Sequence, residues 1–217
     1  MRYEYILFDL DGTVTDSALG ITNSVMHALN KYGIAVNERS ELNRFVGPPL
    51  HDSFKNFYGF SNEEANKAVE YYREYYVDKG IFENTVYDGI EELFQSLKEN
   101  GRRLVLATSK PEIFAKQILE YFDLAKYFTY IAGSNLDGTR TKKDEVIKYA
   151  LESCNITDLT KSIMIGDREY DILGAKKVGI DSIGVLYGYG DSNEFEKADA
   201  DYIVHTVDEI GKILLDE

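Results

Sequence analysis

The chain has 217 residues, of which 44% are hydrophobic and 29% charged, and its formal net charge is −14 at pH 7. These values are typical of a globular chain with one or two domains, and no apolar run approaches the ~20 residues needed to span a bilayer. The acidic balance argues against nucleic acid or an anionic membrane as a partner, because both require a basic protein surface.

The first predicted element is a buried strand over residues 5–8, where four consecutive residues are apolar or aromatic. Two carboxylates, Asp9 and Asp11, follow this strand directly, and Gly12 comes next. Two acids this close repel each other unless a cation lies between them. The end of the first strand is therefore a candidate cation site.

The next block, over residues 16–82, is predicted to be helical and contains no convincing strand. Apolar residues recur at helical spacing over 17–32, and a glycine ends that pattern. Ser61, followed three residues later by Glu64, forms a capping box, which opens a helix predicted to run through Tyr76. This block therefore predicts a helical domain inserted after the first strand.

Strands and helices alternate along the rest of the chain. Buried strands are predicted at 104–107, 130–132, 163–165 and 182–186, with an edge strand at 201–204. Amphipathic helices are predicted at 90–98, 113–122, 146–151, 172–178 and 207–215. Such alternation is typical of a parallel sheet with crossover helices on both faces. We therefore predict an α/β protein with a Rossmann-like, doubly wound core over 1–15 and 83–217 and an α-helical cap domain over 16–82.

Polar residues also follow two of the later strands. Thr108 and Ser109 follow one strand, and Asp167 follows another, with Asp171 four residues further on. Because the carboxyl ends of parallel strands lie at one edge of a sheet, these residues should meet the two acids that end the first strand. Four aspartates with no neighbouring Cys or His form a set of hard oxygen ligands, which suits Mg²⁺ rather than Zn²⁺.

A cluster of this kind also suits a phosphate group. Thr108 and Ser109 offer a hydroxyl and backbone N–H groups at an expected strand-to-helix turn, where anions bind. A cation is needed as well, and two lysines precede the helix near residue 146. Lys143 is nearer the helix and is our choice, and Lys142 is the alternative. A solvated lysine at a helix end is the competing interpretation for either residue.

These motifs resemble those of the haloacid dehalogenase superfamily. The stretch "ILFDLDGT" matches its first motif, hhhDxDGT, and "LVLATS" matches its second. Lys143 is similar to the lysine of its third motif, and "GDREYD" matches the GDxxxD of its fourth. The resemblance covers essentially the whole chain, and the helical insert is similar to the cap of the phosphoglycolate phosphatase-like and 5′-nucleotidase-like branch.

The resemblance implies roles for the aspartates. Asp9 is expected to be the nucleophile that forms an aspartyl-phosphate, and Asp11 is expected to move the proton of the leaving group and of water. The implied metal set is Asp9, Asp11 through its backbone carbonyl, Asp167 as a direct ligand and Asp171 from the second shell or through water. An aspartate at the position of Asp11 favours phosphate transfer over dehalogenation.

The resemblance also implies which residues hold the phosphate. Thr108, the Ser109 backbone and Lys143 are expected to bind it, and Thr108 and Lys143 thereby take part in catalysis. Gly12 permits a tight turn and close approach of the backbone.

Substrate choice is expected to depend on the helical insert, because the core recognises only the phosphate. Gly47 and two prolines after it interrupt the helices of residues 44–54, which predicts a rigid loop. Arg44 is a candidate partner for a second anionic group of the substrate. A helix corner with a surface arginine is the competing interpretation.

The sequence therefore predicts a Mg²⁺-dependent phosphatase acting on a small phosphorylated metabolite: phosphoglycolate, a nucleoside monophosphate or a sugar phosphate. A phosphomutase similar to β-phosphoglucomutase is the first alternative, and a non-catalytic binding or regulatory protein is the second. The single cysteine, Cys154, excludes an internal disulfide and suits the cytoplasm, where we expect a monomer or homodimer. The N-terminus does not have the pattern of a signal peptide.

Overall fold

The computed structural model describes residues 2–215, which form two compact units. One unit comprises the chain up to Thr15 and from Val86 onward, and the other is Asp16–Thr85. The short strands β2 (Thr15–Asp16) and β3 (Thr85–Val86) pair with each other where the chain passes between the units. No helix within the described residues is long and apolar enough to cross a membrane.

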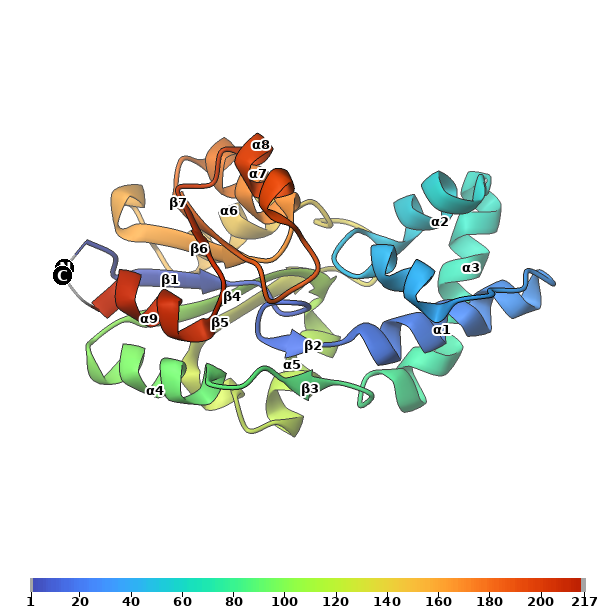
Figure 1. Ribbon diagram of the computed structural model, residues 1–217, viewed down its shortest axis with the longest axis horizontal. Coiled ribbons are helices and arrows are strands. Elements are labelled where there is room, and N and C mark those ends of the chain that lie inside the picture. Colours follow the sequence, from blue (N-terminus) through green and yellow to red (C-terminus); the bar gives the residue numbers. More distant parts are fainter. Residues whose placement is uncertain (1, 216–217) are drawn as a thin grey trace. The chain divides into compact units, whose positions relative to one another are not determined.

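The first unit is built on a six-stranded sheet with the order β5-β4-β1-β6-β7-β8 (Figure 1). All neighbouring strands in it run parallel, as predicted. The strands are β1 (Tyr5–Phe8), β4 (Arg103–Pro111), β5 (Phe128–Ser134), β6 (Ser162–Gly166), β7 (Asp181–Val185) and β8 (Tyr202–Val204). Two neighbouring strands, β1 and β6, pair with Phe8 opposite Ile165, so the two strands end within one residue of each other.

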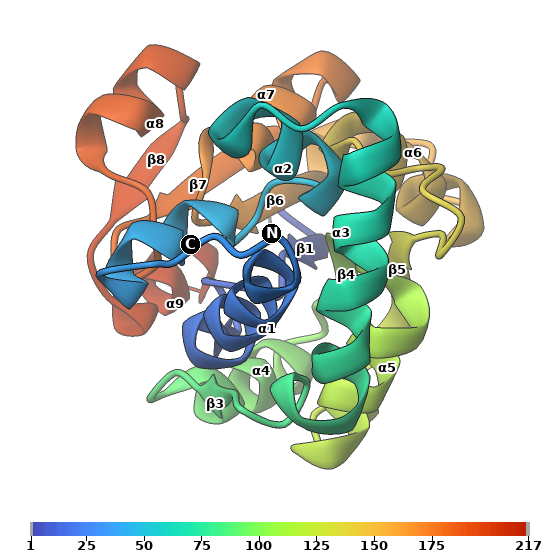
Figure 2. The same cartoon turned by 90° about the vertical axis from the view of Figure 1, so that its right-hand side faces the viewer.

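Helices cover both faces of this sheet. In Figures 1 and 2, α6 (Lys143–Ser153) and α7 (Glu169–Val178) lie on one face, and α4 (Ile90–Glu99), α5 (Glu112–Tyr121) and α9 (Val207–Leu215) lie on the other. The remaining helices of this unit are α8 (Ser192–Ala198) and the single turns η3 (Ala125–Tyr127) and η4 (Leu159–Lys161). The α/β architecture expected from the alternating pattern is confirmed.

The core of this unit includes a cluster between the sheet and the pair α6–α7. Leu7, Val105 and Met164 come from three adjacent strands, and Val146 and Ile147 come from α6; all five are fully buried. Because both faces of the sheet are covered, its strands are apolar in runs rather than in alternation. These apolar runs are the pattern from which the strands were predicted.

The second unit is helical, as expected of the insert. Its elements are α1 (Ala18–Lys31), η1 (Arg39–Phe45), α2 (Leu50–Tyr58), α3 (Asn62–Tyr75) and the π-helical turn η2 (Tyr76–Gly80). The predicted capping box is confirmed: Ser61 Oγ accepts a hydrogen bond from the Glu64 N–H at 3.2 Å, and the Ser61 N–H donates to Glu64 Oε2 at 2.9 Å. An edge-to-face cluster centred on Phe45 and Phe54 packs η1 against α2.

Three local features differ from the sequence predictions. The strand predicted at 104–107 does not end at the polar residues Thr108 and Ser109 but continues through Pro111. Its register against β5 shifts between Ala107 and Pro111. A helix begins at Leu50, so the irregular part of 44–54 is confined to residues 46–49. The helix α8 was not predicted, since its seven residues are too few to show a helical period.

Candidate active site

Three aspartates from two strand ends meet in one buried group. Asp9 follows β1, Asp167 follows β6, and Asp171 lies in the first turn of α7. One carboxylate oxygen from each lies within 4.8 Å of the others. The Asp9 N–H donates to the Ile165 carbonyl at 2.9 Å, which continues the pairing of β1 with β6 and brings Asp9 close to Asp167. The convergence follows from two adjacent parallel strands ending at the same level.

Lys143, the first residue of α6, is buried among these acids. Its ammonium lies 2.8 Å from Asp9 Oδ1 and 2.7 Å from Asp171 Oδ1, and it donates a hydrogen bond to the Ala107 carbonyl at 3.2 Å. Burial alone lowers the pKa of this lysine, but the Asp171 and Asp9 carboxylates outweigh it and raise the pKa above its ordinary value. The ammonium is therefore charged and bound to the protein on three sides.

One ammonium does not balance three buried carboxylates. Burial, reinforced by the charges of Asp171 and Asp9, raises the pKa of Asp167 well above its usual range. Burial also raises the pKa of Asp171 to about 6, with Asp9 acting in the same direction and Lys143 opposing it. Among residues 2–215, Asp167 Oδ1 is buried and has no hydrogen-bond partner. An excess of buried negative charge and an unsatisfied carboxylate oxygen fit a divalent cation with oxygen ligands, such as Mg²⁺.

Asp11 is separated from this group. The Lys110 ammonium lies 2.8 Å from Asp11 Oδ1, and only 6% and 10% of the two side chains are exposed. The turn after Asp11 is closed by a hydrogen bond from the Gly12 N–H to the Thr15 carbonyl at 2.8 Å. The two aspartates of the DxD stretch therefore have different partners, and the carboxylate of Asp11 is not part of the three-acid group.

Gly12 is required by its contacts as well as by its conformation. Its φ is +84°, in the region that favours glycine. A Cβ at this position would lie 2.0 Å from Asp167 Oδ2, far inside contact distance. The turn after β1 can therefore approach the acid after β6 only with a glycine at this position.

The expected phosphate-binding residues lie inside the extended strand β4. Thr108 is buried, and its Oγ1 accepts a hydrogen bond from the Lys110 N–H at 3.3 Å, whereas Ser109 is half-buried. The turn into α5 comes at Pro111, three residues later than expected. The sequence analysis did not identify Lys110 as a site residue. Its position could have indicated it, because Lys110 comes two residues after Thr108, near the end of a strand that pairs with β1.

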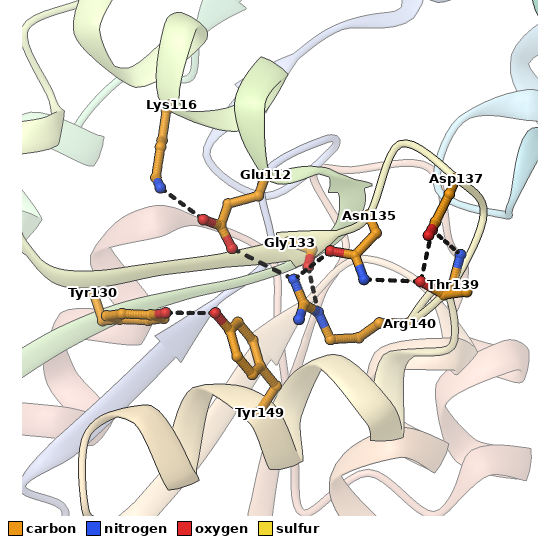
Figure 3. Close-up of polar contacts among 9 residues, drawn as sticks. All are labelled: Glu112, Lys116, Tyr130, Gly133, Asn135, Asp137, Thr139, Arg140 and Tyr149. Atoms are coloured by element: carbon orange, nitrogen blue, oxygen red, sulfur yellow. Dashed lines mark hydrogen bonds and ion pairs between the residues drawn. The ribbon is translucent and has the colours of Figure 1, made fainter.

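The loop before α6 is anchored by Arg140 (Figure 3). This guanidinium lies 3.6 Å from the ring centroid of Tyr149, and its Nε donates to the Gly133 carbonyl at 2.8 Å. Its Nη2 lies 3.6 Å from Glu112 at the start of α5. Arg140 thereby ties the end of β5 and the start of α5 to α6, the helix that begins with the buried lysine.

The other predicted residues lie elsewhere. Lys142 is the N-cap residue of α6 and is exposed. Arg44 and Gly47 belong to the second unit, where the Arg44 guanidinium lies over the rings of Phe57 and Tyr58, at 4.5 and 5.5 Å. A contact of Arg44 or Gly47 with substrate stays a prediction.

The chain is similar to several named proteins. A 5′-nucleotidase of Pseudomonas aeruginosa is 46% identical over 194 residues, which cover 89% of this chain and 87% of that protein. The tyrosine-protein kinase PtkA of Mycobacterium tuberculosis is 38% identical over 97% of this chain and 72% of its own length. Phosphoglycolate phosphatases match at lower identity, for example 28% for that of Colwellia psychrerythraea, over 95% of both chains.

A solved structure is also similar over the full length of both chains. It is described as a predicted phosphatase from Clostridium acetobutylicum, is 56% identical in sequence and superposes with a TM-score of 0.97. The sequence model of the haloacid dehalogenase-like hydrolases matches residues 6–185, which include the DxD turn, Lys143 and the acids after β6. The chain therefore belongs to the haloacid dehalogenase-like hydrolase family.

Proposed function

We propose that the protein is a Mg²⁺-dependent phosphomonoesterase that works through a phosphorylated Asp9. The observation that carries this proposal is the separation of the two neighbouring acids. Asp9 is grouped with Asp167, Asp171 and the Lys143 ammonium, whereas Asp11 is paired with Lys110. A nucleophile beside a cation site and a proton carrier outside it are the two groups that phosphate transfer to and from a carboxylate requires.

In the first half of the proposed reaction, an oxygen of Asp9 attacks phosphorus and the bond from phosphorus to the leaving oxygen breaks. The Asp11 carboxyl supplies the proton that the leaving oxygen takes. In the second half, water attacks the aspartyl-phosphate, Asp11 takes a proton from it, and inorganic phosphate leaves with Asp9 restored. Each half ends with Asp11 in the protonation state that the next half needs.

The neighbouring residues hold the phosphate and the nucleophile. Lys143 places a positive charge 2.8 Å from Asp9 Oδ1, and Thr108 with the Ser109 backbone is proposed to bind the phosphate oxygens. Asp167, supported by Asp171, would hold Mg²⁺, which supplies positive charge to the transferring phosphate.

The proposed substrate is a small phosphorylated metabolite. The relative named 5′-nucleotidase favours a nucleoside monophosphate, and the relatives named phosphoglycolate phosphatase favour a small phosphorylated acid. A carboxylate or second phosphate on the substrate is the proposed partner for Arg44, which is exposed apart from its stacking on two aromatic rings.

Transfer to an organic acceptor in place of water is the second candidate. The similarity to a protein named as a tyrosine kinase favours it, because the same aspartyl-phosphate can pass its phosphate to a hydroxyl group. A phosphomutase would use the same step.

The test is a phosphate-release screen over metabolite phosphates and a generic aryl phosphate, with Mg²⁺ or EDTA, ranked by kcat/KM. We expect Mg²⁺-dependent release that is abolished in Asp9→Asn, and full activity in that variant would refute the nucleophile. Phosphate that appears on an added alcohol or sugar phosphate rather than in solution would favour the transferase or mutase. An absence of turnover on the whole panel would favour a non-catalytic protein.

A further inference from the structure

A short segment after β7 lies directly against the candidate metal site. Residues 187–190 read Tyr-Gly-Tyr-Gly, and the motifs of the site do not include them. The Tyr189 N–H donates a hydrogen bond to Asp167 Oδ2 at 2.9 Å. The Tyr187 hydroxyl donates to the Thr13 carbonyl at 2.9 Å. The segment therefore contacts both the acid after β6 and the turn after β1.

The two glycines of the segment pack against Asp167 and Gly12 so closely that no side chain fits. A Cβ on Gly188 would lie 2.3 Å from Asp167 Cβ and 2.4 Å from the Gly12 carbonyl oxygen. A Cβ on Gly190 would lie 2.2 Å from the Asp167 carbonyl oxygen. These distances are far below contact distance, and the nearest atoms are backbone or Cβ atoms, which cannot rotate away. Only glycine fits at either position without displacing Asp167.

The two oxygens of the Asp167 carboxylate have different surroundings. Oδ2 accepts a hydrogen bond from the backbone N–H of Tyr189, whereas Oδ1 is buried and accepts none from the part of the chain that the structure describes. A carboxylate held in this way can turn only by losing the hydrogen bond from Tyr189. The free oxygen is thereby kept in one direction.

We propose that residues 187–190 are a positioning element that holds Asp167 in the orientation needed to bind a divalent cation. The hydrogen bond from Tyr189 and the close packing of Gly188 and Gly190 all act on Asp167, so we expect the effect on cation affinity. This inference rests on the proposed function, because it takes the three-acid group to be a metal site. Groups that orient metal ligands typically change metal affinity by about 10–100-fold when they are removed.

The experiment is a titration of metal-stripped protein with Mn²⁺, in which free Mn²⁺ is measured by electron paramagnetic resonance. Mn²⁺ is the probe because it binds to oxygen ligands as Mg²⁺ does. We expect Gly188→Ala to bind Mn²⁺ about tenfold more weakly than the wild type or worse. Gly211→Ala is the matched control, since its added Cβ would make an ordinary 3.6 Å contact with Leu93, and its affinity should equal that of the wild type.

Circular dichroism checks that each variant is folded. If Gly188→Ala does not fold, Tyr187→Phe decides the question, because it removes only the hydroxyl that bonds to Thr13; we expect about threefold weaker Mn²⁺ binding from this milder change. Catalysis gives a second readout: the Mg²⁺ concentration for half-maximal hydrolysis should rise in Gly188→Ala, while the KM for an aryl phosphate at saturating Mg²⁺ stays constant.

The outcomes separate this inference from the proposed function. A wild-type protein that binds no Mn²⁺ would overturn the metal site and the proposed function with it. A wild type that binds Mn²⁺, together with a folded Gly188→Ala of equal affinity, would overturn the positioning role alone. If Gly188→Ala is unfolded, unchanged affinity in Tyr187→Phe would do the same.

Discussion

Removal of the Lys143 charge should destabilise the core unit strongly. At 2.7 to 2.8 Å, its ammonium attracts each of two carboxylates by about 6 kcal/mol at an effective dielectric constant near 20. The net contribution is smaller, because burying the ammonium itself costs several kcal/mol and a carboxyl that loses its partner can take up a proton. Removing one member of a buried ion pair generally costs about 3–5 kcal/mol, and we expect Lys143→Met to lower the free energy of unfolding by that amount.

The assay is urea denaturation in EDTA, followed by far-ultraviolet circular dichroism and by tyrosine fluorescence, since the chain has no tryptophan. Lys142→Met is the matched control: the same change is made one residue earlier, at an exposed side chain, where we expect less than about 0.5 kcal/mol. Equal free energies of unfolding for the two variants would refute the electrostatic reasoning. Retained hydrolysis in Lys143→Met with loss in Lys142→Met would reverse our choice of lysine.

Three further predictions concern the proton carrier, the metal and the helical unit. Lys110→Met removes the contact that holds the Asp11 side chain in place, so kcat should fall by about 10²-fold with little change in KM. An unchanged kcat would show that the pair is dispensable. In metal-free protein the pKa of Asp171 is raised to about 6, whereas in the unfolded chain it is near 4. Between these pH values the folded protein binds a proton that the unfolded chain does not, so the stabilising contribution of Asp171 falls as pH rises. Mg²⁺ binds the ionised form, so it should raise the melting temperature more at pH 7.5 than at pH 5, and an equal rise at both would contradict the assignment. Ser61→Ala removes the cap of α3 and should lower the free energy of unfolding of the helical unit by about 1 kcal/mol, measured by urea denaturation against Ser192→Ala in the other unit.

The strands and most helices could be predicted from the sequence because burial leaves a local record. A strand covered on both faces, such as 5–8 or 163–165, is an unbroken apolar run. A capping box such as that of Ser61 involves residues only three apart. The extension of β4 to Pro111 and the helix α8 left no such record, because both depend on what lies beside them rather than on local period.

A set of candidate residues could also be proposed from the sequence, because parallel strands must bring their carboxyl ends to one edge. Asp9, Asp11, Thr108 and Asp167 could be placed together without knowing any distance. The partner of each residue could not be read in this way. Lys143 was expected to bind phosphate, and the structure adds that its ammonium already contacts two carboxylates and a carbonyl.

The amino-acid sequence alone determines which chemical groups are available in this protein: acids, a hydroxyl and lysines at the ends of parallel strands. Only the folded chain decides how these groups are paired. Asp9 and Asp11 are two residues apart and equally acidic in sequence, yet one lies among buried acids and the other against Lys110. The physical reason is that ion pairing and desolvation act over a few ångströms in space, between groups that lie up to about 160 residues apart in the chain.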